Sequence, residues 1–258
     1  MTGTGRDIAV RRSPVRRWIL LFALISVAAA FAGLGVWQVQ RLAWKLDLIE
    51  RVDARVHAEP VSAPGPERWS EINASHDEYI RVRLDGIFLH DKEVRVVAST
   101  ERGPGYWVMT PLVRQDGTTV IVNRGFVPNE MRDASVRAAG QIEGPATVVG
   151  LLRISERDSW ILRKNDPVAD RWYRRDPIEI GTAGSLAAVA PFFVDADATP
   201  NRGGWPLGGL TRVHFSNSHL IYALTWFALA VMAAIGAFYV VRTEFLATSS
   251  AEHSDPAS

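Results

Sequence analysis

The sequence predicts an α+β membrane protein in which two transmembrane helices flank a mainly antiparallel, barrel-like β domain outside the cytoplasm. Two uncharged apolar stretches predict the helices, and short runs dense in β-branched and aromatic residues predict the domain between them. The overall composition hides this division. Hydrophobic residues make up 47% of the chain and charged residues 22%, which is ordinary for a globular protein.

The first stretch, Trp18 to Gln40, predicts the first transmembrane helix. At about 1.5 Å per residue it can cross roughly 30 Å of hydrocarbon, and Trp18 and Trp37 stand near its ends, where indole rings favour the headgroup region. A cleaved signal peptide is an alternative, since small residues at 28–32 offer a cleavage site. The run is longer than a usual signal core, however, and it leads directly into a helical pattern at 41–57.

The second stretch, Leu220 to Val241, predicts the second transmembrane helix. Aromatic residues again stand near its ends, at Tyr222, Trp226 and Tyr239. Buried core helices are the alternative for both stretches, but two such uninterrupted apolar runs are unusual in a soluble domain of this size.

Arginine dominates the segment before the first stretch. Five arginines and a single acidic residue, Asp7, lie there, and the positive-inside rule places such a segment in the cytoplasm. A mitochondrial presequence is an alternative, but only 17 residues precede the span, so we expect a bacterial cytoplasmic membrane protein with both termini inside. The predicted segments are cytoplasmic 1–17, transmembrane 18–40, extracytoplasmic 41–219, transmembrane 220–241 and a disordered cytoplasmic tail at 242–258.

The central segment begins with an amphipathic helical pattern at 41–57 and then changes to short strand-like runs. Gln115-Asp116-Gly117 lies between two of these runs and predicts a hairpin turn, which favours antiparallel strands. Asp176-Pro177 predicts the start of a helix over 178–189. The strand-like runs are 79–89, 93–98, 107–113, 118–123, 146–154, 192–195 and 211–215.

The composition excludes several classes of function. A chain without cysteine has no disulfide, thiolate zinc site, iron–sulfur cluster or covalently attached haem. Residues 41–219 carry 23 Lys and Arg against 24 Asp and Glu with both signs interspersed, so no nucleic-acid partner is expected. No G-x-S-x-G, H-E-x-x-H or phosphate-loop motif occurs in its proper context, and we therefore expect no enzyme activity.

One histidine occupies a position typical of function. His219 stands at the first turn of the second apolar stretch, and an ionisable group at a membrane boundary is a default functional hypothesis. Tyr222 and Trp226 follow it at i+3 and i+7, on the same helix face. A simple anchoring role at the interface is the alternative.

The end of the first stretch emerges on the same outer side and carries Trp37, Gln38, Arg41, Trp44 and Lys45. Of these, Trp37, Arg41 and Trp44 share one stripe at i, i+4 and i+7. If the two helix ends pack together, they offer an imidazole for iron, aromatic faces for a macrocycle and two cations for propionates, which a haem pocket requires. The alternative is that both cations extend to lipid phosphates and the tryptophans form an aromatic belt. The candidate site residues are His219, a possible haem-iron ligand, with Tyr222, Trp226, Trp37, Arg41 and Lys45.

Four segments together resemble a known family. Gly35 to Lys45 (GVWQVQRLAWK) resembles a G-x-W-Q-x-x-R-x-x-W-K signature, and Asn217 to Phe227 (NSHLIYALTWF) resembles N-N-H-L-x-Y-x-x-T-W-[FY]. Asn123 to Pro128 resembles R-G-W-V-P with Phe126 in place of Trp, and Asn165 with WYRRD at 172–176 fits N…W-Y-x-x-D. These are motifs of the Surfeit-locus family of cytochrome c oxidase assembly factors.

The resemblance implies a helper in maturation of the haem a-containing oxidase. It implies cytochrome c oxidase subunit I, haem a synthase and the lipid membrane as partners, and haem a as a transiently held cofactor, with His219 matching the family histidine considered for haem. A permanent accessory subunit that does not bind haem is the main alternative. A sensor or enzyme with an outer ligand-binding domain is a third, but the short tail has no room for a signalling domain.

Overall fold

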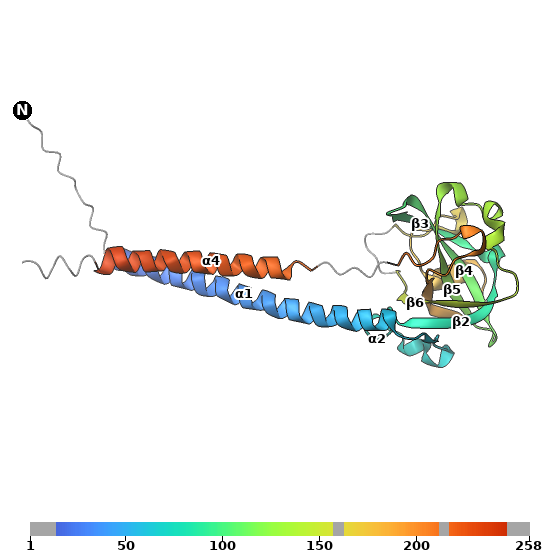
Figure 1. Ribbon diagram of the computed structural model, residues 1–258, viewed down its shortest axis with the longest axis horizontal. Coiled ribbons are helices and arrows are strands. Elements are labelled where there is room, and N and C mark those ends of the chain that lie inside the picture. The colour runs from blue at the N-terminus through green and yellow to red at the C-terminus, as the bar shows by residue number, and fades with distance from the viewer. Residues whose placement is uncertain (1–13, 157–162, 212–216, 247–258) are drawn as a thin grey trace, which may run out of the picture. The chain divides into compact units, whose positions relative to one another are not determined.

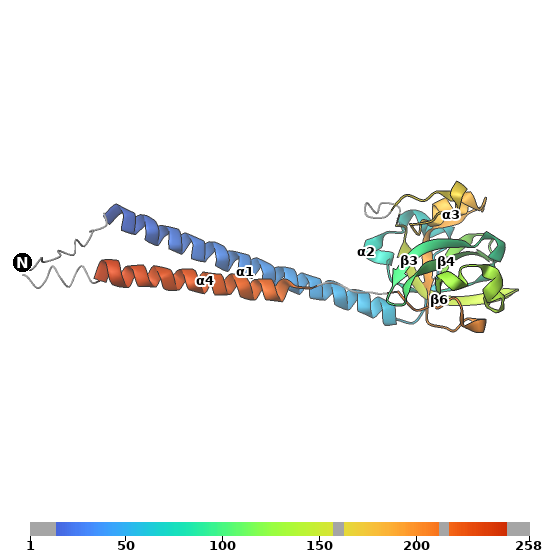
Figure 2. The same cartoon turned by 90° about the horizontal axis from the view of Figure 1, so that it is seen from above.

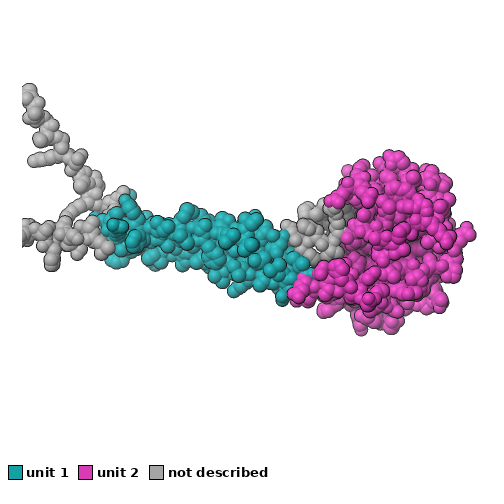
Figure 3. All heavy atoms as spheres, in the orientation of Figure 1, with its two compact units in different colours: residues 1–49, 215–258 teal, residues 50–214 magenta. Residues whose placement is uncertain are grey.

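A computed structural model describes residues 14–156, 163–211 and 217–246 of this chain. It contains two long apolar helices, α1 and α4, and a mainly β domain between them in sequence (Figure 1). The chain divides into two compact units, residues 1–49 with 215–258 and residues 50–214, which Figure 3 colours separately. This confirms the predicted fold class.

The two long helices have the length and exposure of membrane spans. Helix α1 is continuous over Pro14–His57, and α4 covers His219–Val240. The most apolar windows of α1 and α4 are only 11% and 6% buried, which argues against core helices of a soluble protein. At 44 residues α1 is about 66 Å long, roughly twice the hydrocarbon thickness, so one helix contains both the apolar stretch and the amphipathic pattern at 41–57.

Helices α1 and α4 run side by side in antiparallel directions (Figures 1 and 2). The ring centroids of Phe31 and Trp226 are 5.5 Å apart. One turn further along α1, a Cβ added to Gly35 would lie 2.7 Å from the Phe227 ring. The absence of a side chain at Gly35 therefore lets the two helices approach closely, as small residues do in membrane helix pairs.

The β domain is built around a closed barrel of five strands. The strands occur in the order β1-β2-β6-β7-β5-β4-β3, and an additional pairing between β2 and β4 closes the ring. Most pairs are antiparallel, as predicted, but β1 with β2 and β5 with β7 are parallel. The strands are β1 (Val61–Ser62), β2 (Arg81–Phe88), β3 (Val94–Thr100), β4 (Gly103–Arg114), β5 (Thr119–Pro128), β6 (Pro145–Ile154) and β7 (Val189–Ala196).

Strand β5 separates two hydrophobic clusters. Val120 and Val122 belong to the cluster enclosed by the barrel strands, whereas Ile121 joins a second cluster that includes Trp172 and Ile180. Because both faces are covered, β5 is buried along almost its whole length. This explains why residues 120–122 of the strand are a continuous apolar run that does not alternate with polar residues.

Two short helices accompany the barrel. Helix α2 covers Ala74–Asp77 and α3 covers Pro177–Ala183. The Asp176 side chain accepts hydrogen bonds from the Ile178 and Glu179 amides, which is the predicted N-cap. Helix α3 ends earlier than the predicted range of 178–189, because residues 189–196 form strand β7.

Parts of three predicted segments lie outside the described residues. They are residues 1–13 of the basic N-terminus, residues 247–258 of the C-terminal tail and most of the strand predicted at 211–215. The structure therefore leaves these three predictions as they stand.

Candidate functional site

The candidate site lies where α4 begins. Ser218 is the N-cap residue of α4, and His219 is its first helical residue. The side-chain oxygen of Asn217 accepts a 3.4 Å hydrogen bond from the His219 backbone amide. The Asn-Ser-His segment thus starts the helix and places an imidazole in its first turn.

The imidazole of His219 contacts α1 through one nitrogen. Its Nδ1 lies 2.8 Å from Oε1 of Gln38. An amide oxygen can only accept a hydrogen bond, so Nδ1 carries the proton in this geometry, and in the neutral ring Nε2 then keeps its lone pair. Among the residues that the structure describes, none forms a hydrogen bond with Nε2. One ring nitrogen is therefore held while the other remains available as a ligand.

The two aromatic candidates on α4 have different surroundings. The Trp226 ring packs against Phe31 of α1, so it belongs to the contact between the helices. Tyr222 is 53% exposed, and its described hydrogen bond is the one from its backbone amide to the Ser218 carbonyl. Of these two residues, only Trp226 has a ring contact with α1 in the part of the chain that the structure describes.

The candidates on α1 lie at the edge of the helix pair. Trp37 is 50% exposed, and Arg41 places its guanidinium 5.0 Å from the centre of the Trp44 ring. Within the described ranges, neither Trp37 nor Arg41 forms a hydrogen bond or ring contact with α4. Lys45 is half-buried and lies seven residues after Gln38, on the same helix face.

Gln38 is the residue that sequence reasoning did not select. The sequence placed Trp37, Arg41 and Trp44 on one stripe, but the residue that reaches His219 lies immediately after Trp37. The signal was present as the W-Q dipeptide of the first signature. Only the rotation of α1 relative to α4 reveals that Gln38, rather than Trp37, faces His219.

The donor chemistry at this end of the helix pair fits a haem. Metal-bound histidines usually donate their second ring N–H to a nearby acceptor, and the Gln38–His219 hydrogen bond has this form. Arg41 and Lys45 lie about one and two turns beyond Gln38 and could pair with carboxylates. The set supplies one axial nitrogen and two cations.

The β domain has its own polar centre, at Asp195. This carboxylate is buried and accepts hydrogen bonds from Asn123 at 2.7 Å, Arg153 at 2.9 Å, Arg175 at 3.1 Å and Thr211 at 2.9 Å. Burial alone would lower the pKa of Arg175, but Asp195 and Glu156 outweigh it and raise that pKa. The cavity of about 690 Å³ beside the cluster is lined in part by Arg153, Arg175 and Asp195, which pair with one another.

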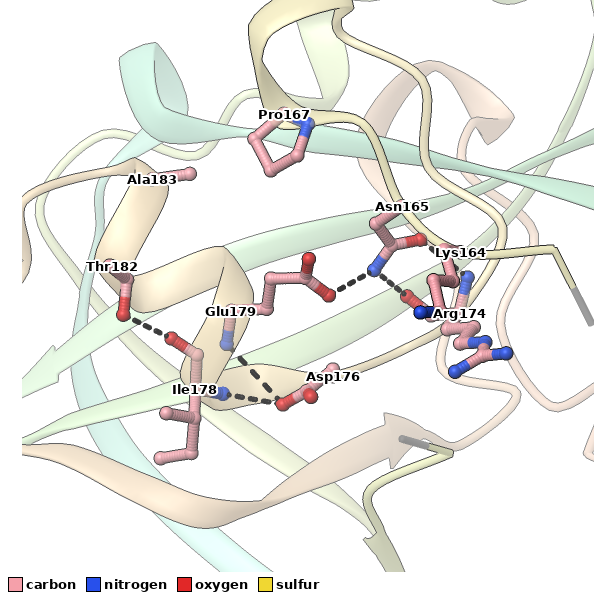
Figure 4. A pocket seen from close by; sticks show the side chains of 9 residues that line it. All are labelled: Lys164, Asn165, Pro167, Arg174, Asp176, Ile178, Glu179, Thr182 and Ala183. Carbon is pink, nitrogen blue, oxygen red and sulfur yellow. Dashed lines mark hydrogen bonds between the residues drawn. The ribbon is translucent and has the colours of Figure 1, made fainter. Parts of the chain in front are cut away.

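A second cavity of about 550 Å³ lies beside α3 (Figure 4). The side chain of Asn165 forms part of its wall. Its amide nitrogen donates hydrogen bonds to the Arg174 carbonyl and to Glu179, and its amide oxygen accepts from the backbone amides of Tyr173 and Arg174. Every hydrogen-bonding group of this amide is thus used within the protein. The weaker N…W-Y-x-x-D motif consequently has a structural role, which is to hold the chain that precedes α3.

The Arg-Gly-Phe-Val-Pro segment is also structural. Phe126 is fully buried and meets Trp107 edge-on, with ring centroids 6.0 Å apart, so an aromatic face satisfies this position without an indole N–H. Arg124 donates to the Gly140 carbonyl and to Asn201, and its burial lowers its pKa to about 10. Within the described residues, no group of three or more His, Asp or Glu could hold a metal ion.

The family comparison covers both helix signatures. The model of the SURF1 family matches residues 25–231, from within α1 to within α4. The chain belongs to the SURF1 family. This confirms the resemblance found in the sequence, including Gln38 and His219 within the matched range.

Individual SURF1-family members match over most of the chain. Surfeit locus protein 1 of Homo sapiens is 36% identical over 231 residues, covering 83% of this chain and 73% of its own length. The Rattus norvegicus protein is 35% identical over 229 residues, covering 83% and 71%. A SURF1-like protein of Monosiga brevicollis is 35% identical over 227 residues, covering 83% and 84%.

Proposed function

We propose that this protein assists the assembly of a haem a-containing cytochrome c oxidase by holding haem a for, or stabilising, the nascent subunit I. Membership in the SURF1 family implies a role in cytochrome c oxidase assembly. The finer proposal, haem a handling at His219, is supported by the geometry at the start of α4.

The observation that carries the proposal is the arrangement of His219. Its Nδ1 is bonded to Gln38, and its Nε2 has no hydrogen-bond partner among the described residues. A bound haem would supply an iron that accepts the Nε2 lone pair, and its propionates are matched in charge by Arg41 and Lys45. The exposed Tyr222 and Trp37 offer flat apolar surface beside this position.

The membrane setting follows from the helices. Both are long and apolar enough to cross a bilayer. The arginine-rich N-terminus supports a cytoplasmic location for both chain ends, with the β domain outside, in a bacterial cytoplasmic membrane. In this topology His219 lies at the outer membrane surface, where subunit I and haem a synthase are the proposed partners.

The proposal is tested by deleting the gene in a bacterium that has both a haem a oxidase and an oxidase without haem a. We expect oxidase activity and haem a content to fall for the first enzyme only, with restoration by the wild-type gene. Equal loss of both enzymes would contradict an assembly role specific to haem a.

A permanent accessory subunit is distinguished by stoichiometry. An assembly factor is expected at far less than one copy per purified oxidase, whereas a subunit stays at one copy. Quantitative mass spectrometry of the purified oxidase measures this ratio, and a constant one-to-one ratio would favour the accessory subunit.

A further inference from the structure

The inference concerns Gln38, which family membership alone does not connect to any function. Gln38 is half-buried, whereas its neighbours Trp37 and Val39 are 50% and 46% exposed. Its amide therefore does not extend into the surroundings of the helix as an ordinary surface glutamine does. It is directed toward α4, where its oxygen lies 2.8 Å from His219 Nδ1.

Packing between α1 and α4 holds the Gln38–His219 contact in place. Phe31, Gly35 and Gln38 lie at i, i+4 and i+7 of α1, which is one face of the helix. The first two contact Trp226 and Phe227 of α4. The face of α1 that packs against α4 thus also places the Gln38 amide next to His219.

The contact selects between two neutral forms of the histidine ring. With the Gln38 oxygen as acceptor, the proton is on Nδ1 and Nε2 is a free base. In the other neutral form the proton is on Nε2, and that nitrogen cannot bind a metal. A polar contact between ring and acceptor also restricts rotation of the imidazole.

We propose that Gln38 is the positioning residue for His219, holding the ring in the Nδ1–H form with Nε2 available as a ligand. The role of Nε2 toward haem iron rests on the proposed function. The form of the ring does not, because it is a property of the protein without haem. The two claims can therefore be tested separately.

The direct test is nitrogen NMR of the full-length protein in lipid nanodiscs without haem. The protein is labelled with ¹⁵N at histidine and studied near pH 8, where an ordinary imidazole is neutral. A His219→Gln sample identifies the His219 signals among those of the six histidines. We expect a protonated Nδ1 and an unprotonated Nε2, and a wild-type ring protonated mainly on Nε2 would overturn the proposal.

Two methionine variants form a matched pair. Gln38→Met keeps the length of the side chain but removes the amide oxygen, whereas Gln40→Met makes the same change at an exposed position two residues away. We expect the first to shift the ring toward the Nε2–H form and the second to leave it unchanged. An unchanged ring in Gln38→Met also overturns the proposal. If Gln38→Met fails to fold, the wild-type spectrum still tests the proposal, because it shows which ring nitrogen of His219 carries the proton.

Haem titration separates this inference from the proposed function. Residues that hydrogen-bond to a metal-binding histidine typically contribute about 10–100-fold to metal affinity. We therefore expect haem affinity to fall by about that factor in Gln38→Met and to stay unchanged in Gln40→Met. If the wild type binds no haem, the proposed function fails while the nitrogen spectra still decide the claim about Gln38. If haem binds through His219 but Gln38→Met binds it equally well, the positioning role fails alone.

Discussion

The β domain and the pair of long helices use polar groups in opposite ways. In the β domain the buried Asp195 is surrounded by four donors, two of them arginines. In the helix pair the imidazole of His219 has one nitrogen bonded and the other without a hydrogen-bond partner among the described residues. The first arrangement stabilises a fold, and the second retains capacity for a ligand.

The difference shows why the cavities beside Asp195 and beside α3 are not the best candidates for function. The walls beside Asp195 and beside α3 include polar groups already bonded to one another, such as Arg175 with Asp195 and Asn165 with Glu179. A ligand entering either cavity would have to compete with these bonds. At His219 a ligand only has to bind a lone pair that the protein leaves available.

The largest expected effect comes from breaking the Asp195 cluster. Asp195→Ala leaves the buried Arg153 and Arg175 without a shared carboxylate, and losing one partner of a buried ion pair typically costs about 3–5 kcal/mol. Urea unfolding of the full-length protein in detergent, followed by hydrogen exchange of the β strands, measures the loss.

Asp197→Ala is the control for this variant. Asp197 lies two residues further on and forms a longer, half-exposed ion pair with Arg81, at 3.7 Å. We expect a cost below about 1 kcal/mol. Equal destabilisation by the two variants would show that the buried cluster has no special role in stability.

An intermediate effect is expected at the closest approach of the helices. Gly35→Val places a Cβ against the Phe227 ring, and overpacking of this kind costs about 1–3 kcal/mol. Because the chain has no cysteine, a single disulfide between residues introduced by Phe31→Cys and Trp226→Cys reports the packing of α1 against α4.

Gly33→Val provides the comparison for the helix experiment. Nothing lies within 4 Å of a Cβ added at Gly33, two residues before Gly35. We expect the cross-linking yield to fall in Gly35→Val and to stay at the parent level in Gly33→Val. Equal yields in all three proteins would mean that Gly35 does not set the approach of the helices.

The smallest effect on stability is expected from a change at Asp116, in the β4–β5 turn. The Thr118 hydroxyl and amide donate to Asp116 and lower the pKa of its carboxyl below the ordinary value of 3.8. The ionised carboxylate therefore adds stability above pH 3.8, and this contribution is lost as the pH falls through the lowered pKa.

Asp116→Asn tests that contribution. Because the side chain is exposed, we expect a loss below about 1 kcal/mol near neutral pH. The difference from wild type should vanish in acid, where both side chains are uncharged. Urea midpoints measured across this pH range check the prediction, and a difference independent of pH would contradict it.

The sequence was sufficient for features that depend on local pattern. The absence of charge predicted both long helices, and the Asp-Pro pair predicted the start of α3. It was not sufficient where distant segments meet. The parallel pairing of β5 with β7 and the four donors at Asp195 come from segments far apart in the chain.

The candidate site shows the same limit. Residue type and position at the start of a helix singled out His219. Helical periodicity alone could not tell which α1 residue would face it, because the rotation of one helix against another depends on packing at Gly35 and Phe31. The sequence therefore selected Trp37 and Arg41 and passed over Gln38 between them.

The central claim is that His219 binds haem a through its free nitrogen. The most direct measurement is the reduced-minus-oxidised visible spectrum of the protein purified after co-expression with haem a synthesis. The comparison variants are His219→Ala and, as a control, His57→Ala, which alters an exposed histidine bonded to Asp53. The account predicts a haem a band in wild type and His57→Ala that is lost in His219→Ala. A band of equal strength in all three proteins, or in none while oxidase assembly is still supported, would contradict it.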